Sequence, residues 1–188
     1  MSSKRFFDII TATALLMILC LPILIIALIV RIGSKGPILY WSDRIGIDNI
    51  VFKMPKFRTM RVDTPAVATH LLGNAEAYLT PSGVFLRKSS LDELPQLFSI
   101  LKGDMSFVGP RPALYNQDDL IELRTKKSVH TIIPGITGWA QVNGRDDLSI
   151  PEKVEYDEYY LKNRSFLMDI RILWMTFIKV LKTEGIKH

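Results

Sequence analysis

The sequence predicts a mostly helical α+β fold that a proline-broken N-terminal helix attaches to a membrane. Three observations support this prediction: a long uncharged N-terminal run, two short apolar segments separated by a turn, and several helical patterns joined by Gly- and Pro-rich connectors. Strands and helices do not alternate regularly, so a doubly wound parallel sheet is not expected. We predict a re-entrant membrane hairpin over residues 1–35 and a cytoplasmic domain over residues 36–188.

The composition indicates that apolar residues are concentrated in part of the chain. Of 188 residues, 48% are hydrophobic although 23% are charged, and the net charge is +5. The positive charge favours anionic partners without choosing among phosphates, nucleic acid and an acidic membrane surface. Cys20 is the single cysteine, which excludes an intrachain disulfide. The three histidines, His70, His130 and His188, lie too far apart in sequence to indicate a metal site.

The uncharged run extends from Ile9 to Val30, which is long enough for a transmembrane helix. Pro22 lies inside the run and removes a helical hydrogen bond, which predicts a break. The arm from Ile9 to Leu21 would rise only about 20 Å, whereas the hydrocarbon core of a bilayer is about 30 Å thick. A straight span that is merely kinked at Pro22 remains the alternative.

Both flanks of this run are basic. Lys4 and Arg5 precede it, and Arg31 and Lys35 follow it. The positive-inside rule keeps both ends in the cytoplasm, and only a re-entrant hairpin allows that arrangement. We therefore predict a segment that enters and leaves the membrane on its cytoplasmic face.

A small β-hairpin is predicted directly after the membrane run. Its strands are the apolar segments 38–41 and 50–54, with a turn at Asp48-Asn49 between them. Residues 62–83 have weak periodicity and predict a loop with a short helix. Residues 138–144 have the pattern of a strand that ends in an Asn-Gly turn.

Helical periodicity predicts the remaining elements. Three helices are expected at 92–102, 118–126 and 151–162. A fourth, at 165–182, has apolar residues at spacings of three and four, namely Phe166, Leu167, Ile170, Leu173, Trp174, Phe177 and Ile178. Basic residues occupy its other positions, so an amphipathic helix at a membrane interface is expected, with a core-packing helix as the alternative.

The segment Arg87–Gln96 holds the densest group of reactive side chains. Ser90 and Glu93 match a capping box, so a helix start is expected here, and that role alone is the simpler interpretation. Asp92 would lie in the first helical turn, where the helix dipole stabilises its ionised form. An ionised Asp92 can attack phosphorus and form an acyl phosphate. Asp92 and Glu93 together can bind Mg²⁺, and Arg87 is near enough to meet developing phosphate charge.

Further cations are candidates for binding phosphate. Arg111 lies between Pro110 and Pro112, whose restricted φ angles reduce the entropy lost when the guanidinium binds an anion. Lys56 and Arg58 add two more positive charges. Neither a P-loop nor a Rossmann glycine pattern occurs in the chain.

Taken together, these segments resemble the bacterial sugar transferase family, the monotopic polyprenyl-phosphate phosphoglycosyl transferases. The resemblance covers nearly the whole chain, and its two longest motifs are highly specific. Besides the proline-broken run, the matching stretches are KRFFD at 4–8, KFRTM at 56–60, SLDELPQL at 90–97, LKGDMSFVGPRP at 101–112, PGITGWAQVNGR at 134–145 and Tyr159-Tyr160. Leu21 departs from those relatives that have serine before the proline.

The resemblance implies a Mg²⁺-dependent enzyme on the cytoplasmic face of the inner membrane, with residues 36–188 as its catalytic domain. Asp92 would attack the β-phosphate of a UDP-sugar and release UMP, with Glu93 as its dyad partner. Undecaprenyl phosphate, a polyprenyl phosphate, would then accept the phosphosugar from Asp92 in the first membrane step of glycan assembly. The partners implied are the UDP-sugar, the polyprenyl phosphate, the lipid bilayer and downstream glycosyltransferases, and no nucleic acid.

The resemblance also implies which residues bind the substrate. Arg87 and Arg111 match anion-binding positions of the family, and Asp157 matches a downstream acidic position. The predicted substrate-binding set is Arg87, Arg111, Arg145, Lys56, Arg58, Gln141 and Asp157.

Two other function classes remain open. A non-catalytic basic module that binds anionic lipid at a membrane surface would explain the charge, but it gives no reason for Asp92 and Glu93 among cations. A metal-dependent phosphatase that uses an aspartyl phosphate is the narrower alternative. Release of UMP from a UDP-sugar, with and without polyprenyl phosphate, separates the three classes.

Overall fold

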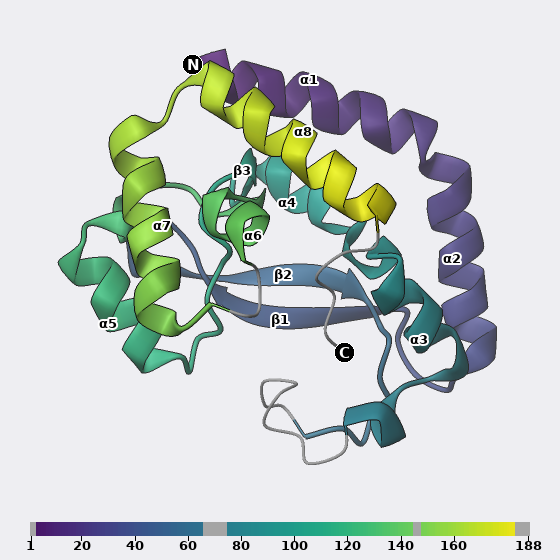
Figure 1. Ribbon diagram of the computed structural model, residues 1–188. Helices are drawn as coiled ribbons and strands as arrows, with labels where there is room; N and C mark the ends of the chain where they lie inside the picture. The colour runs from purple at the N-terminus through teal and green to yellow at the C-terminus, as the bar shows by residue number, and fades with distance from the viewer. Residues whose placement is uncertain (1–2, 66–74, 145–147, 183–188) are drawn as a thin grey trace.

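The computed structural model describes residues 3–65, 75–144 and 148–182, and its fold is α+β and mostly helical, as predicted. Figure 1 shows α1 and α8 along one side, the β1–β2 hairpin in the middle, and α5 and α7 at one end. With η marking a 3₁₀ helix, the elements are α1 (Ser3–Ile18), α2 (Cys20–Gly33), β1 (Leu39–Ile45), η1 (Ile47–Asn49), β2 (Val51–Phe57), η3 (Ala75–Tyr78), α3 (Pro81–Lys88), η4 (Leu91–Glu93), α4 (Gln96–Lys102), β3 (Ser106–Val108), α5 (Asp118–Lys126), η5 (Val129–Thr131), β4 (Gly135–Thr137), α6 (Trp139–Asn143), α7 (Ile150–Asn163) and α8 (Phe166–Lys182).

The N-terminal helix is interrupted close to Pro22, as its sequence predicts. α1 ends at Ile18, α2 begins at Cys20, and the two helices are bent by 64°. Pro22 lies in the first turn of α2, where its missing N–H is tolerated; in a continuous helix its ring would meet the carbonyl of Ile18. Within the described ranges, no single helix is long and apolar enough to span a membrane. α1 and α2 have the required length and apolarity only when they are taken together as this bent pair.

The first turns of α1 are fastened to the rest of the protein by polar contacts. Lys4 Nζ lies 2.6 Å from Asp169 Oδ2, and the Tyr160 hydroxyl donates to Asp169 Oδ1 over 2.6 Å. Arg5 donates to the last carbonyl groups of α4, and the buried Asp8 accepts from a backbone amide of β3. These contacts explain why two basic residues and an acidic residue cluster at the start of an apolar helix.

The predicted hairpin is present, with β1 and β2 antiparallel. Asp48 and Asn49 form its turn with φ values of 53° and 60°, a left-handed conformation that Asn and Asp tolerate. Because side chains alternate along a strand, Arg44 of β1 and Lys56 of β2 lie on one face of the hairpin. This face carries the basic residues of the candidate site.

Helices α5, α7 and α8 lie where periodicity predicts them, but the expected helix at 92–102 is divided in two. Leu91–Glu93 forms the 3₁₀ turn η4, and α4 begins only at Gln96, after Pro95. Ser90 has φ 57°, and its side chain caps no helix. The predicted capping box is therefore wrong, because a left-handed Ser90 does not hold its hydroxyl over the following turn.

The segment predicted as a strand at 138–144 contains the helix α6 instead. The strand in this region is β4, which pairs in parallel with β3. The two backbones approach so closely that a Cβ atom on Gly135 would lie 2.1 Å from the nitrogen of Gly109. Neither strand was predicted from the sequence, because a three-residue strand offers too few positions for an alternation pattern.

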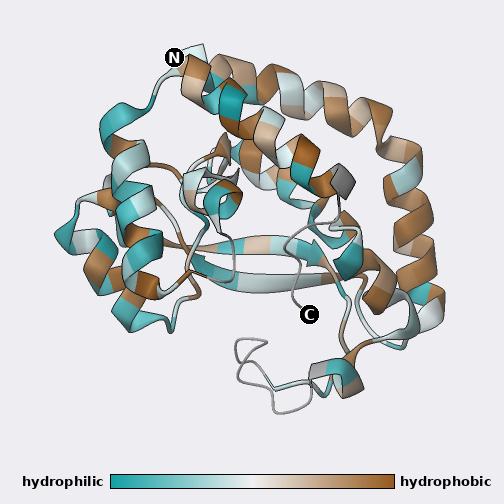
Figure 2. Cartoon of the chain, viewed as in Figure 1, coloured by the Kyte–Doolittle hydropathy of each residue, from teal (hydrophilic) through white to brown (hydrophobic). Residues whose placement is uncertain are grey.

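Apolar side chains cover the outer faces of α2 and α8 as well as the interior. In α8, Ile172 is fully buried in the main core, whereas Leu167, Trp174 and Phe177 on the opposite side are exposed. Figure 2 shows the hydrophobic residues concentrated on α1, α2 and α8. α8 therefore has two apolar sides, one packed in the core and one facing outward.

Candidate active site

The candidate site is built around Glu93, at the end of η4. Glu93 Oε1 accepts hydrogen bonds from Lys56 Nζ over 2.7 Å and from Arg111 Nη2 over 2.9 Å. Lys56 lies near the end of β2, and Arg111 lies in the connector between β3 and α5. Three segments distant in sequence thus meet at one carboxylate.

The two cations keep Glu93 ionised. Its burial opposes the charged form, but the charges of Arg111 and Lys56 and their hydrogen bonds hold the pKa of Glu93 well below its usual range. A group with such a depressed pKa does not donate a proton near neutral pH. Glu93 is therefore suited to holding cations in place rather than to acid catalysis.

Asp92 is only 7% exposed and faces a different environment. Its side chain has no hydrogen bond to any residue that the structure describes, and burial raises its pKa, assisted by the charge of Glu93 and opposed by Lys56, Arg87 and Arg111. The expectation that a helix dipole lowers this pKa is wrong, because Asp92 lies in a short 3₁₀ turn and not at the start of α4.

Arg87 is brought to the dyad from α3, a helix that the sequence analysis did not predict. Thr80 caps α3 by accepting from the amide of Gly83, and a Cβ atom at Gly83 would lie only 2.0 Å from the carbonyl oxygen of Thr59. Arg87 Nε donates to Thr59 Oγ1 over 3.0 Å. Burial lowers the pKa of Arg87 and the nearby Asp92 raises it, so the two side chains are close enough to interact electrostatically.

Arg44 is a further cation of the site that sequence reasoning missed. Burial and the charge of Arg111 lower its pKa, Glu93 and Tyr40 oppose these effects, and the resulting pKa is about 10. The sequence carries no local signal for this role, because the predicted strands at 38–41 and 50–54 contain neither Arg44 nor Lys56; the observed strand register places the two side chains on one face. Four cations, Arg44, Lys56, Arg87 and Arg111, surround two carboxylates, which leaves an excess of positive charge for an anion.

Other predicted substrate-binding residues have different surroundings. Arg58 is buried, and its guanidinium donates to the backbone and side chain of Ser34 and to the carbonyl of Lys35, so it fastens the end of α2. Asp157 is 1% exposed and pairs with Arg124. The assignment of both residues to substrate binding stays a prediction.

Gln141 and Arg145 complete the predicted set. Gln141 lies on α6, and both polar atoms of its amide are buried without a hydrogen-bond partner in the part of the chain that is described. Such an amide needs a partner, which keeps Gln141 a candidate for contacting a ligand. Arg145 lies outside the described residues.

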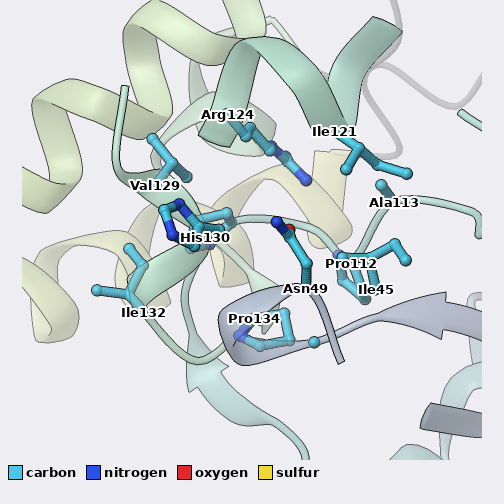
Figure 3. Close-up of a pocket in the computed structure, with 12 residues that line it drawn as sticks. Ile45, Asn49, Pro112, Ala113, Ile121, Arg124, Val129, His130, Ile132 and Pro134 are labelled. Carbon is cyan, nitrogen blue, oxygen red and sulfur yellow. The ribbon is translucent and has the colours of Figure 1, made fainter. Parts of the chain in front are cut away.

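A small pocket lies beside the segment that carries Arg111, and Figure 3 shows the residues that line it. Pro112, Arg124 and His130 contribute to it, whereas neither Asp92 nor Glu93 does. The lining is mostly apolar. The pocket therefore lies against the segment that carries Arg111, and the carboxylates of Asp92 and Glu93 are not part of it.

The carboxylates fit a metal ion that takes few ligands from protein. No group of three or more His, Cys, Asp or Glu side chains that could hold a metal occurs among the described residues. Mg²⁺ is commonly bound by one or two carboxylates together with substrate phosphates and water. Asp92, which lacks a described hydrogen bond, and the remaining oxygen of Glu93 are the available protein ligands.

We expect Lys56→Met to shift the acidic limb of the pH profile of kcat/KM to higher pH. The predicted attack of Asp92 on phosphorus requires the ionised carboxylate, so activity is expected to fall as the pH drops through its pKa. Lys56 lowers that pKa, and its removal therefore raises it. Lys53→Met is the matched control, because Lys53 lies on the same strand, is 67% exposed and pairs with Asp43 at the surface. An unchanged acidic limb in Lys56→Met would remove Asp92 as the titrating group.

Comparisons with known proteins show which family the chain resembles. The profile of the family described as bacterial sugar transferase matches residues 1–183. The chain is 43% identical over 187 residues to the uncharacterized sugar transferase EpsL of Bacillus subtilis, an alignment that covers 98% of this chain and 90% of that protein.

Two longer relatives have names that specify a reaction. One is the UDP-glucose:undecaprenyl-phosphate glucose-1-phosphate transferase of Escherichia coli, 40% identical over 184 residues, covering 94% of this chain and 39% of that protein. The other is the undecaprenyl-phosphate galactose phosphotransferase of Salmonella typhimurium, 36% identical over 202 residues, covering 97% of this chain and 41% of that protein. The chain thus spans about two fifths of the length of these two relatives.

Proposed function

The chain belongs to the bacterial sugar transferase family, and on that premise we propose that it transfers a sugar 1-phosphate from a UDP-sugar to undecaprenyl phosphate. The observation that carries the proposal is the buried Asp92 next to Glu93, which is ion-paired with both Lys56 and Arg111. A nucleophile among fixed cations suits attack on the phosphorus of a dianionic diphosphate. The names of the two longer relatives support this donor and this acceptor.

In the first proposed step, a carboxylate oxygen of Asp92 attacks the β-phosphorus of the UDP-sugar. The new bond is an acyl phosphate to the sugar phosphate, and the bond that breaks is the one between this phosphorus and the bridging oxygen. UMP leaves with the electron pair of that bond. Arg87 and Arg111 stabilise the charge that develops on the phosphate oxygens, and burial of Asp92 supplies a weakly solvated nucleophile.

In the second proposed step, a phosphate oxygen of undecaprenyl phosphate attacks the same phosphorus. The acyl phosphate bond breaks, the Asp92 carboxylate returns, and undecaprenyl diphosphate sugar is the product. Neither step requires a net proton transfer. The strongly depressed pKa of Glu93 is consistent with this, since its role here is to orient Lys56 and Arg111.

We propose Mg²⁺ as the cofactor, held by Asp92 and Glu93. When bound, the ion would neutralise charge on the diphosphate and on the departing UMP. The chain itself contributes the two carboxylates and the four surrounding cations, and the substrate phosphates supply further ligands. Turnover is therefore expected to require a divalent cation.

We also propose that residues 1–35 form a re-entrant hairpin at the cytoplasmic face of the inner membrane, with residues 36–188 as the catalytic domain. Support comes from the 64° bend between α1 and α2 and from the exposed apolar residues of α2, including Leu24 and Leu28. The outer side of α8, with Trp174 and Phe177, would lie at the interface. Undecaprenyl phosphate, a membrane lipid, would then reach the dyad without leaving the bilayer.

Both ends of the hairpin are expected to react with thiol reagents from the cytoplasmic side only. Single cysteines at Ser3 and Ser34 in a Cys20→Ser background report the two ends. An impermeant reagent added to intact cells should label neither position, and it should label both in inverted vesicles. Labelling of Ser3 from the periplasm with Ser34 protected would mean that the segment crosses the membrane.

The reaction is tested by incubating purified protein with a panel of UDP-sugars, with and without undecaprenyl phosphate, and measuring UMP. We expect UMP release with one or a few sugars, dependent on Mg²⁺ and stimulated by the lipid. Initial rates with both substrates varied should give parallel double-reciprocal lines, because a covalent intermediate separates the two half-reactions. Intersecting lines would exclude that intermediate. Sustained hydrolysis of the UDP-sugar without lipid would indicate a phosphatase. Absence of UMP release with every UDP-sugar would indicate a binding module.

A further inference from the structure

Arg111 is the one exposed residue in an otherwise buried run of the chain. All other residues from Met105 to Ala113 are buried, whereas the Arg111 side chain is 46% exposed. Its neighbours Pro110 and Pro112 have no amide hydrogen, so they donate no backbone hydrogen bonds that would order this segment. Groups that donate to the carbonyl oxygens of this segment therefore contribute to the order of its backbone.

Each of the four carbonyl groups of Pro110–Ala113 accepts a hydrogen bond from a different residue. The first accepts from the first amide of β4 and the last from an amide of β1, both over 2.9 Å. The two middle carbonyl groups accept from arginine side chains. Arg124 Nη1 lies 2.8 Å from the oxygen of Arg111, and Arg44 Nη1 lies 3.2 Å from the oxygen of Pro112.

Both arginines are themselves anchored. Asp157 Oδ2 accepts from Arg124 Nε over 3.0 Å and from Arg124 Nη2 over 2.6 Å, and the two side chains are 1% and 11% exposed respectively. Arg44 Nε donates to Ser42 Oγ over 3.0 Å. Figure 3 shows Arg124 extending from α5 into the pocket that Pro112 also lines. A planar guanidinium can reach Asp157 and the backbone at once, which the single nitrogen of a lysine cannot do.

We propose that Arg124 and Arg44 are positioning residues, which hold the Arg111–Pro112 peptide so that the Arg111 guanidinium stays at Glu93, ready to bind an anionic group of the substrate. Asp157 orients Arg124 in this arrangement, so it acts on the site indirectly, through Arg124 and Arg111. The inference rests on the proposed function, because it assigns these residues a role in binding the sugar diphosphate. It gives Asp157, an acidic residue unsuited to contacting phosphate, an indirect role at the site.

A double-mutant cycle tests the proposal. UMP release is measured for the wild type, Arg124→Lys, Arg111→Ala and the protein carrying both changes. Misplacement of a substrate-binding group by about 1 Å can cost up to about 10²-fold in rate, so we expect Arg124→Lys to lower kcat/KM at least about tenfold. If Arg124 acts through Arg111, the same change should cost less than about twofold when Arg111 is already alanine.

Lys126→Gln is the matched control, because Lys126 also lies at the end of α5 but pairs with Glu122 at the surface, and it should behave as wild type. Equal losses of activity from Arg124→Lys in both backgrounds would overturn the proposal, since they would show a general effect on folding. Wild-type activity of Arg124→Lys would overturn the role of Arg124. If Arg124→Lys does not fold, the cycle is measured with Arg44→Lys in place of Arg124→Lys, and the same outcomes support or overturn the proposal.

A second measurement does not depend on turnover. With ¹⁵N-labelled arginine, the Nε signal of Arg111, assigned by its loss in Arg111→Lys, reports how well its side chain is ordered. We expect this signal to broaden or move in Arg124→Lys and in Asp157→Asn, and to stay unchanged in Lys126→Gln. An unchanged Arg111 signal in the first two variants would contradict the positioning role even if the protein transferred no sugar phosphate, whereas absence of UMP release by the wild type contradicts the proposed function alone.

Discussion

Asp92→Asn should abolish sugar phosphate transfer while leaving the protein at least as stable as the wild type. The amide cannot form the acyl phosphate, and loss of a covalent nucleophile costs about 10³-fold or more in kcat. The asparagine is nearly isosteric and carries no charge, so it removes the cost of burying an ionised carboxylate that is 7% exposed and without a described hydrogen bond. UMP release and the melting temperature at pH 8 measure the two effects.

The pH dependence of stability gives the sign of the effect at Asp92. Its pKa is raised in the folded protein, so the folded state binds more protons than the unfolded state between the ordinary pKa of aspartate and the raised value. Stability contributed by this group therefore falls as the pH rises through that window. The melting temperatures of Asp92→Asn and the wild type should converge at low pH and separate at high pH, in favour of the variant.

Asp63→Asn is the control for this variant, because Asp63 is 59% exposed and pairs with Arg61 at the surface. It should keep full activity and an unchanged melting temperature. Incubation with a labelled UDP-sugar without lipid should label the wild type and Asp63→Asn but not Asp92→Asn. A melting temperature for Asp92→Asn several degrees below that of the wild type would show that the carboxylate has stabilising partners.

Glu93→Gln should reduce both activity and stability, although the chemical change is the same as at Asp92. Glu93 Oε1 holds Lys56 and Arg111, so the amide removes the negative charge to which both cations are hydrogen-bonded. Loss of a charged hydrogen-bond acceptor costs about 2 kcal/mol of stability, and displaced cations should lower kcat/KM by about 10²-fold. Denaturant unfolding and UMP release are the measurements.

The opposite signs at adjacent residues make this pair of variants informative. Glu122→Gln serves as the control, because Glu122 pairs with Lys126 on the surface of α5, where ion pairs contribute little. It should change neither stability nor activity. If Glu93→Gln were as stable as the wild type, Lys56 and Arg111 would have other partners, and the proposed role of Glu93 in orienting them would be wrong.

Features that depend on a few neighbouring residues were predictable from the sequence. The break near Pro22 follows from a missing amide hydrogen, and the turn at Asp48-Asn49 from two residues that tolerate positive φ. Helix α5 was located to its boundaries by its periodicity. The adjacent carboxylates of Asp92 and Glu93 are visible beside basic residues in one short segment, and their role as a catalytic dyad stays a prediction.

What each charged side chain contacts depended on the tertiary structure. Arg58 and Arg111 are both cations in family motifs, yet one fastens the end of α2 and the other faces Glu93. Arg44 and Arg124 carry no local sign of their roles, which arise because β1 and α5 meet at the same backbone segment.

The two carboxylates illustrate the physical reason. The sequence by itself determined that Asp92 and Glu93 are adjacent and surrounded by positive charge, but it assigned Asp92 a lowered pKa from a helix dipole. The pKa of a carboxylate depends on its solvation and on the charges a few ångströms away. Packing placed Lys56 and Arg111 on Glu93 and left Asp92 buried without a described hydrogen bond, so the pKa of one is lowered and that of the other is raised.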